Sequence, residues 1–321
     1  FTRAGPGVTA LVVKVLLQSG RGLEDPVVAK GLDFVDKFRQ EDGGYYAQVY
    51  PTYNTAIVLS TLALVPGDRY REQIPKAQKF LRATILAENH TDEQGKPLTK
   101  DHPWYGGSSY GTNARMGRPD LSNTQYVLEG LRDSGVSKDD PDVQKILIFV
   151  SRCQANSETN DQRWAKGRSD GGLVYVIPKN NLSEAEVERK GEQVLQAYGS
   201  MTYAGFKSFL YAGLTKEDQR VKAARRWIGE NWTLKINPGL GDESGIYNYY
   251  HLFARALLAN QEETIVDAKG LSHNWRQELE AVAQQQQKPD GSFVNAKERW
   301  MESDPVLATT YMVLALQEAR K

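Results

Sequence analysis

The sequence predicts an all-α protein in which helix pairs close into an α/α toroid. Two kinds of helical segment alternate along its 321 residues, one amphipathic and one nearly free of charge. A helix that is apolar on every side must be buried on every side, so the charge-poor segments form an inner layer that the amphipathic segments cover. Repetition of such pairs is typical of closed or curved arrays. We therefore expect a single domain over residues 1–321, with about six inner and five to six outer helices.

The amphipathic segments begin with clear start signals. Asp25-Pro26 and Asp140-Pro141 each open one, because Asp caps free backbone amides and Pro at the first helical position loses no hydrogen bond. Apolar residues then recur at helical spacing, as Val28 and Leu32 do after the first start. Similar segments lie near 72–87, 218–232 and 273–287.

The charge-poor segments supply the inner helices. They span residues 7–19, 51–65, 121–131, 199–214, 246–259 and 305–316. Glu129, Lys207 and Arg255 are isolated charges on these segments, and buried charges need partners. We therefore expect the three either to pair across the ring or to point at its open end.

A glycine turn recurs between an amphipathic segment and the next charge-poor one. Its copies are Gly43-Gly44-Tyr45, Gly171-Gly172-Leu173 and Gly291-Ser292-Phe293. Two insertions, 88–120 and 155–198, are too long for simple connections, and loops of this length are commonly functional. Both precede inner helices, so we expect them to rim one mouth of the ring.

Composition excludes several classes of function. The chain carries 40 Lys+Arg and 40 Asp+Glu, and this balance argues against nucleic acid or an anionic membrane as a partner. No apolar run reaches the roughly 18 residues of a transmembrane segment. The single cysteine, Cys153, excludes an internal disulfide framework and a multi-thiolate metal site, and the four histidines lack metal-ligand spacing, so we expect neither metal nor cofactor. Phe1 in place of Met is typical of a processed or trimmed chain, and processing would indicate an extracytoplasmic protein. The sequence does not indicate an oligomeric state.

The last glycine turn carries a family resemblance. Gln287, Gly291 and Phe293 reproduce the spacing of Gln-x3-Gly-x-Trp, with Phe at the Trp position. This turn resembles the repeat of squalene cyclases and protein prenyltransferase β subunits, and the chain is similar to stand-alone, single-toroid bacterial proteins that carry that repeat. The resemblance implies a toroid over nearly the whole chain and an isoprenoid or other apolar ligand in a central, aromatic-lined cavity.

The chemical motifs of that superfamily are altered here. Asp120-Leu121-Ser122-Asn123 stands where the resemblance implies the Asp-x-Asp-Asp motif of terpene cyclases, with Ser122 at the position of the proton donor. Serine cannot supply a strongly acidic proton, so ordinary polyene cyclisation is not expected at this site. Tyr250-His251 resembles the His-bearing helix of the prenyltransferase branch, but the Asp-x-Cys of its zinc site is absent.

Candidate site residues gather at the starts of the inner helices. The candidate catalytic residues are Asp120, His251, Glu302 and Asp304. The candidate ligand-binding residues are Tyr53, Asn54, Asn123, Tyr126, Tyr203, Tyr247, Tyr250, Trp300, Arg115 and Arg118. Structural roles stay open beside these: helix capping for Asp120, Asn54, Asn123 and Asp304, pairing of Glu302 with Arg299, and core packing for His251 and the tyrosines.

Three functions are compatible with these residues. The first is a terpene-cyclase-like protein, an isomerase or lyase by class, that binds an isoprenoid or other apolar ligand. The second is a carbohydrate-active toroid, either a polysaccharide lyase or a glycan-binding module, in which Tyr and Trp rings stack on sugars and His251 or Tyr250 acts as a base. The third is a non-catalytic scaffold whose two long insertions bind protein.

Overall fold

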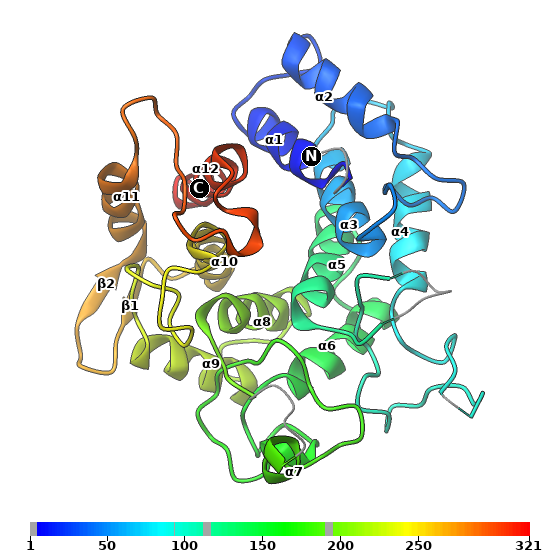
Figure 1. Cartoon of the computed structure of the whole chain (residues 1–321), viewed down its shortest axis with the longest axis vertical. Coiled ribbons are helices and arrows are strands. Elements are labelled where there is room, and N and C mark those ends of the chain that lie inside the picture. Colours follow the sequence, from blue (N-terminus) through cyan, green and yellow to red (C-terminus); the bar gives the residue numbers. More distant parts are fainter. Residues whose placement is uncertain (1–4, 93, 112–116, 190–194) are drawn as a thin grey trace. The chain divides into compact units, whose positions relative to one another are not determined.

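A computed structural model describes residues 5–92, 94–111, 117–189 and 195–321 (Figure 1). The chain divides into two compact units. Unit 1 comprises residues 1–150, 176–181 and 211–213, and unit 2 comprises residues 151–175, 182–210 and 214–321. The expectation of a single domain over 1–321 stays a prediction. Within the described ranges, no helix is both long enough and apolar enough to cross a bilayer.

Unit 1 is built on three buried helices that pack in succession: α1 (Gly7–Gln18), α3 (Pro51–Leu62) and α5 (Leu121–Asp133). The amphipathic α2 (Pro26–Asp36) packs on α1, and α4 (Gln73–Ala83) packs on α3 and α5 (Figure 1). The amphipathic α6 (Pro141–Arg152) follows α5. Every residue of α3 except Tyr53 is buried, as its lack of charge predicts.

Unit 2 repeats this alternation. Its charge-poor helices are α8 (Gly199–Tyr211), α10 (Ile246–Asn260) and α12 (Pro305–Ala319), and its amphipathic helices are α9 (Gln219–Glu230) and α11 (Trp275–Gln286). Helices α10 and α12 pack together, and α11 contacts both. The short elements are η2 (Arg163–Ala165), α7 (Glu184–Arg189) and η3 (Arg299–Met301).

The predicted all-α fold class of the α/α toroid type is confirmed in helix content and in pairing. All six charge-poor segments and all five amphipathic segments form helices close to their expected ranges. The sequence missed one feature, an antiparallel hairpin of β1 (Thr264–Val266) and β2 (Ser272–Asn274). Strands of three residues are too short for a two-residue alternation to be recognised.

The glycine turn is confirmed as a structural repeat, and it has four copies among the described residues. In each copy, the residue two positions after the glycine donates its backbone N–H to the hydroxyl of a threonine near the start of the next charge-poor helix. The pairs are Tyr45 to Thr55 (2.8 Å), Ser108 to Thr124 (2.9 Å), Leu173 to Thr202 (3.1 Å) and Phe293 to Thr309 (2.9 Å). The copy at Gly106-Gly107-Ser108 was hidden inside the 88–120 insertion.

In the copies at Gly43, Gly106 and Gly171, the first glycine of the turn packs directly against a neighbouring amphipathic helix. A Cβ added at Gly106 would lie 1.9 Å from the carbonyl oxygen of Lys145 in α6, and one at Gly171 would lie 2.3 Å from that of Ala223 in α9. Both glycines also have positive φ, which residues with side chains rarely adopt. Only glycine therefore lets the turn approach the helix this closely.

A glutamine side chain bonds the glycine of the turn in two of its copies. The copy at Gly171 carries no glutamine four residues upstream, yet Gln154 donates from Nε2 to the carbonyl oxygen of Gly171 at 3.0 Å. Gln287 makes the matching bond to Gly291 at 3.1 Å. The copy at Gly171 thus has the same Gln-to-Gly hydrogen bond, although residues 155–170 separate Gln154 from Gly171 along the chain.

Two of the isolated charges on the charge-poor helices have ionic partners. Glu129 lies 3.5 Å from the ammonium of Lys14, and Arg255 lies 3.4 Å from the carboxylate of Glu318. Lys207 is fully buried within α8. The ion pairs of Glu129 with Lys14 and of Arg255 with Glu318 agree with the high cost of burying a charge without a partner.

Candidate functional site

Four tyrosines form an aromatic cluster in unit 1, hereafter the tyrosine cluster: Tyr50, Tyr53, Tyr110 and Tyr126. The Tyr53 ring meets the Tyr126 ring edge-on, with centroids 4.9 Å apart, and lies 6.4 Å from the Tyr110 ring. Tyr50 meets Tyr110 edge-on at 5.2 Å. The cluster joins the start of α3 to the loop before α5, so it brings the predicted residues Tyr53 and Tyr126 together.

The outer members of the tyrosine cluster are open to solvent. Tyr50 is 47% exposed and Tyr110 is 37% exposed, whereas Tyr126 is buried. Tyr50 also has a left-handed backbone (φ 56°, ψ 44°) immediately before α3. The hydroxyl of Thr52 donates to the carbonyl oxygen of Gly111 at 2.7 Å and ties the two segments together. Strained residues of this kind cost about 1–3 kcal/mol and concentrate at functional sites.

Asp120 and Asn54 act as helix caps, and Asn123 supports the first of them. Asp120 precedes α5 and accepts hydrogen bonds from the backbone N–H and the side-chain amide of Asn123, both at 2.8 Å. Asn54 accepts the backbone N–H of Gly7 at 2.9 Å and donates to the carbonyl oxygen of Tyr50 at 3.0 Å.

Arg118 of the 88–120 insertion is held by a backbone carbonyl. Arg118 is exposed, and its guanidinium donates to the carbonyl oxygen of Ile177 at 2.8 and 3.2 Å. Arg115 lies outside the described residues. The ligand-binding role predicted for the pair stays a prediction.

The predicted tyrosines of unit 2 lie in its core. Tyr203 packs edge-on against Tyr249 at 5.6 Å, and burial raises its pKa well above the usual value. The hydroxyl of Tyr250 donates to the carbonyl oxygen of Leu234 at 2.7 Å, and that of Tyr247 donates to a backbone carbonyl at 3.4 Å. These buried rings fill the interior of the unit.

Glu302 caps a helix that is distant in sequence. Its side chain is fully buried and accepts the backbone N–H of Asn248 at 2.7 Å and that of Tyr247 at 3.3 Å, both in the first turn of α10. The side-chain amide of Asn295 donates to it at 2.9 Å. Burial raises the pKa of Glu302, although these donors oppose that shift. Two residues later, Asp304 caps α12 by accepting the backbone N–H of Val306 at 2.8 Å.

Trp300 lies beside this double cap and is 45% exposed. Its backbone is left-handed (φ 60°), and that of Met301 is too (φ 65°). The Trp300 ring covers Gly245, where an added Cβ would lie 2.4 Å from a ring carbon. The guanidinium of Arg299 lies 4.4 Å from the centroid of the same ring rather than in an ion pair with Glu302.

The histidines of unit 2 have two different surroundings. His251 is buried in α10, and its ring stacks on that of Tyr311 with centroids 5.7 Å apart. His273 stacks on Trp232 at 4.8 Å, with Glu278 2.7 Å from Nδ1 and Asp267 3.3 Å from Nε2. Among the described residues, no set of three or more His, Cys, Asp or Glu side chains could hold a metal ion.

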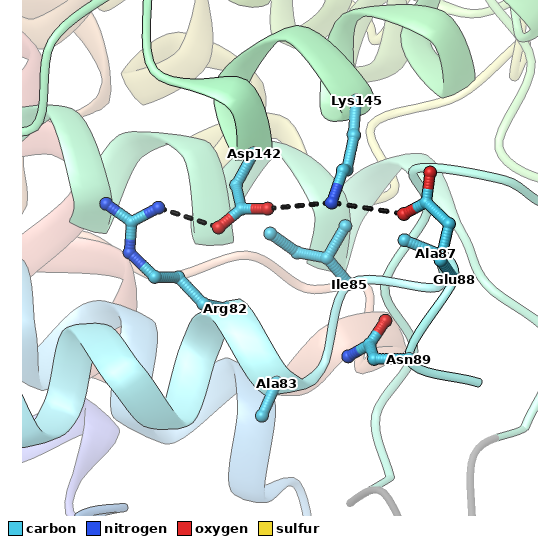
Figure 2. Close-up of a pocket in the computed structure, with 8 residues that line it drawn as sticks. All are labelled: Arg82, Ala83, Ile85, Ala87, Glu88, Asn89, Asp142 and Lys145. Atoms are coloured by element: carbon cyan, nitrogen blue, oxygen red, sulfur yellow. Dashed lines mark hydrogen bonds and ion pairs between the residues drawn. The ribbon is translucent and has the colours of Figure 1, made fainter.

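A charged pocket of about 390 Å³ lies between the end of α4 and the start of α6 (Figure 2). Arg82 pairs with Asp142 at 2.7 Å, Asp142 with Lys145 at 3.3 Å, and Lys145 with Glu88 at 3.2 Å. A hydrogen bond from Tyr105 lowers the pKa of Glu88 to about 2. Because these charges already pair with one another, a ligand would have to break ion pairs to enter. The network instead joins α4 and α6 to the insertion.

The sequence-based candidates omitted two residues of the tyrosine cluster. Neither Tyr50 nor Tyr110 is among the residues that the sequence predicts for the site. The signal for Tyr110 was its place in a Gly- and Ser-rich loop just before Asp120, but the sequence does not show that this loop returns to the start of α3. The hydrogen bond from Thr52 to Gly111 and the ring contacts of Tyr110 make that connection visible.

Comparisons with known proteins show similarity at the level of fold. No family model and no curated protein matches the chain. An alpha-amylase from Clostridium perfringens is similar over 98% of this chain and 85% of its own, with 13% identity and a TM-score of 0.58. A protein from Actinoplanes is similar over 91% of this chain and 98% of its own, with 16% identity and a TM-score of 0.50. The type II terpene cyclase MstE from Scytonema is aligned over 97% of this chain and 99% of its own, with 14% identity and a TM-score of 0.38.

Proposed function

We propose that the protein binds an isoprenoid or a similar apolar ligand on the tyrosine cluster of unit 1. The observation that carries this proposal is the cluster itself. Tyr50, with its left-handed backbone, and Tyr110 are exposed and contact each other. The ring of Tyr53, which is partly buried, contacts the buried ring of Tyr126. Aromatic faces next to a buried floor suit ligands that are mostly apolar. The proposal concerns binding and does not include cyclisation.

Cyclisation is left out because of Asp120 and Ser122. A class II cyclase acid must be held protonated, and two adjacent carboxylates do this by repelling each other's charge. Ser122 replaces one member of such a pair. Asp120 accepts the backbone N–H of Asn123 at 2.8 Å, as a helix cap does. The geometry therefore favours a helix cap over a proton donor.

The exposed area limits the affinity that the cluster can give. Tyrosine side chains offer about 150–250 Å² each, so exposures of 47% and 37% leave roughly 170 Å² to cover. At about 25 cal/mol per Å², this burial stabilises a complex by about 4 kcal/mol, which corresponds to a Kd of about 1 mM before other contacts and costs. Tighter binding would require contacts beyond these two rings.

Saturation-transfer NMR with farnesol tests the proposal. Tyr50→Ala and Tyr110→Ala should each weaken farnesol binding several-fold, and the double variant should abolish it in the millimolar range. Val27→Ala serves as the matched control, because Val27 is a 54% exposed apolar residue on α2 outside the cluster. Equal farnesol binding by the wild-type protein and the double variant, with melting temperatures preserved, would refute the proposal.

A glycan is the second candidate, and the openness of the tyrosine cluster favours it. A ligand on Tyr50 and Tyr110 keeps one side in water, which suits a ring with an apolar face and hydroxylated edges. Chitotetraose in the same NMR assay separates the two classes. Binding of chitotetraose that depends on Tyr50, without binding of farnesol, would replace the isoprenoid by a glycan. The hypothesis of a polysaccharide lyase has less support, because the Tyr250 hydroxyl already forms hydrogen bonds with Leu234 and Gln286 in the core.

A further inference from the structure

The hairpin of β1 and β2 in unit 2 is attached to two neighbouring helices (Figure 1). Strand β2 contacts α11, and the backbone N–H of Ala268 donates at 3.1 Å to the carbonyl oxygen of Gly229, near the end of α9. Val266 and Leu271, on either side of the hairpin turn, are exposed. A two-stranded hairpin is only marginally stable by itself, so its attachments determine how firmly it is held.

His273 of β2 lies between two carboxylates. Glu278 of α11 lies 2.7 Å from Nδ1, and Asp267 of the hairpin turn lies 3.3 Å from Nε2. The indole N–H of Trp232 donates to the other carboxylate oxygen of Glu278 at 2.9 Å, and the Trp232 ring stacks on the imidazole with centroids 4.8 Å apart. The imidazole is therefore oriented with one carboxylate at each nitrogen.

Asp267 is positioned by the hairpin turn. Its Oδ1 accepts the backbone N–H groups of Lys269 and Leu271, at 2.8 and 2.9 Å, and its Oδ2 is the atom that faces His273. Burial by itself would raise the pKa of Asp267, but the backbone N–H of Leu271 and the His273 side chain hold it below its usual value of 3.8. Asp267 is therefore ionised throughout the range in which histidine side chains titrate.

Only a doubly protonated imidazole can donate to both carboxylates. A neutral ring carries one N–H, so its other nitrogen presents a lone pair. Because Glu278 is at the shorter distance, the neutral ring donates from Nδ1, and the lone pair of Nε2 then faces the carboxylate of Asp267. A second proton on His273 replaces this lone pair by a charge-assisted contact.

Three cations stand on the elements around the hairpin: Arg225 on α9, Lys269 in the turn and Arg276 on α11. Arg225 pairs with Glu262 at 3.5 Å, and the guanidinium of Arg276 lies 4.3 Å from the centroid of a tryptophan ring. Lys269 is exposed. In the part of unit 2 that the structure describes, none of the three forms an ion pair with either carboxylate beside His273. The imidazole is therefore the cation that these two acids share.

We propose that His273 is a pH-dependent clamp, which holds the hairpin on α11 more firmly at about pH 5 than at about pH 8. The imidazolium joins Asp267 of the turn to Glu278 of α11. The neutral ring loses the contact with Asp267, so the hairpin opens more often. The change is local, because the hydrogen bond from Ala268 attaches the hairpin to α9 in both states. The clamp goes beyond the binding function proposed above and does not depend on it.

Hydrogen exchange of backbone amides, followed by mass spectrometry, measures how often the hairpin opens. Peptides that cover residues 264–274 are compared at about pH 5 and about pH 8, after correction for the intrinsic pH dependence of exchange. His273→Gln removes the titrating ring. Its matched control is His90→Gln, because His90 is also a half-buried histidine but lies in unit 1. Urea unfolding verifies that each variant is folded.

Asp267→Asn is the second informative variant. Asparagine keeps the oxygen that accepts the two backbone N–H groups of the turn, so the hairpin should still form. Its side-chain NH2 can donate to the lone pair of the neutral His273 but not to the imidazolium. This substitution therefore removes the preference for the protonated ring without removing the ring.

Protection of the wild-type hairpin should be about fivefold higher at about pH 5 than at about pH 8. His90→Gln should keep this difference, His273→Gln should remove it, and Asp267→Asn should remove or reverse it. Equal protection of the wild-type hairpin at both pH values, or a difference that persists in His273→Gln, would overturn the proposal. An equal change in the protection of α8 would also overturn it, because the pH dependence would then be global.

Discussion

Replacement of Glu302 by glutamine tests the double helix cap of unit 2. The carboxylate accepts from Asn248 through one oxygen, and from Tyr247 and Asn295 through the other. Glutamine keeps one acceptor but turns an NH2 group toward two donors. An unsatisfied buried donor costs about 1–3 kcal/mol, and removal of a buried charge offsets part of this. We expect Glu302→Gln to lower the free energy of unfolding by about 2 kcal/mol, roughly a 30-fold change in the unfolding equilibrium.

The pH dependence of this loss follows from the raised pKa of Glu302. A carboxyl whose pKa is raised on folding contributes most stability below its unfolded pKa near 4.5, and loses that contribution as pH rises through the folded value. The difference in stability between the wild-type protein and Glu302→Gln should therefore be largest near pH 4 and shrink toward pH 7. Other titrating groups cancel in this difference.

Urea unfolding followed by circular dichroism, at several pH values between 4 and 7, measures this difference. Glu298→Gln is the matched control, since Glu298 is an exposed acid four residues upstream and should change stability little. A Glu302→Gln variant as stable as the wild-type protein at every pH would refute the capping argument. A difference that widens as pH rises would refute the assigned direction of the pKa shift.

Two further substitutions test the ion network and the glycine turn. Glu88 has a pKa of about 2, lowered first by Tyr105, so its contribution to stability is present above about pH 4.5 and is lost as pH falls toward 2. Because Glu88 is largely exposed, Glu88→Gln should cost under about 1 kcal/mol at pH 6 and nothing near pH 2, as thermal melts across that range would show. Gly106→Ala should cost about 3 kcal/mol by urea unfolding, since the added Cβ meets the Lys145 carbonyl at 1.9 Å. Gly67→Ala, also at positive φ but with nothing within 4 Å, should cost about 1 kcal/mol; equal losses would show that backbone strain alone explains both.

Local signals predicted the capping of several helices correctly. Asp25 accepts the backbone N–H of Val27 at 2.8 Å, as the Asp-Pro start requires, and Asp304 does the same for α12. These interactions span two or three residues, so the sequence alone contains both partners. For Glu302, by contrast, the partners lie more than fifty residues away on α10, so the sequence suggested acid chemistry or an ion pair with Arg299 and did not suggest capping.

The candidate site shows the same division between local and distant information. The sequence found Tyr53 and Tyr126 because each lies at the start of a charge-poor helix, but it gave no reason to join them to Tyr110. The sequence also predicted Tyr203 and Tyr250 as ligand-binding residues, because a tyrosine in a protein core and a tyrosine in a pocket wall look alike in a sequence. Hydrogen-bond partners such as the Leu234 carbonyl distinguish the two cases.

The distribution of charge along the chain determined by itself which segments are helices and which of them are buried. That information is local, because a segment without ionisable groups loses little by leaving water wherever it packs. Only the tertiary structure decided which turn glycine meets which helix and that Gln154 bonds Gly171, which lies 17 residues further along the chain. Those features depend on distances between segments far apart in the chain, and such distances are fixed by packing rather than by the order of residues.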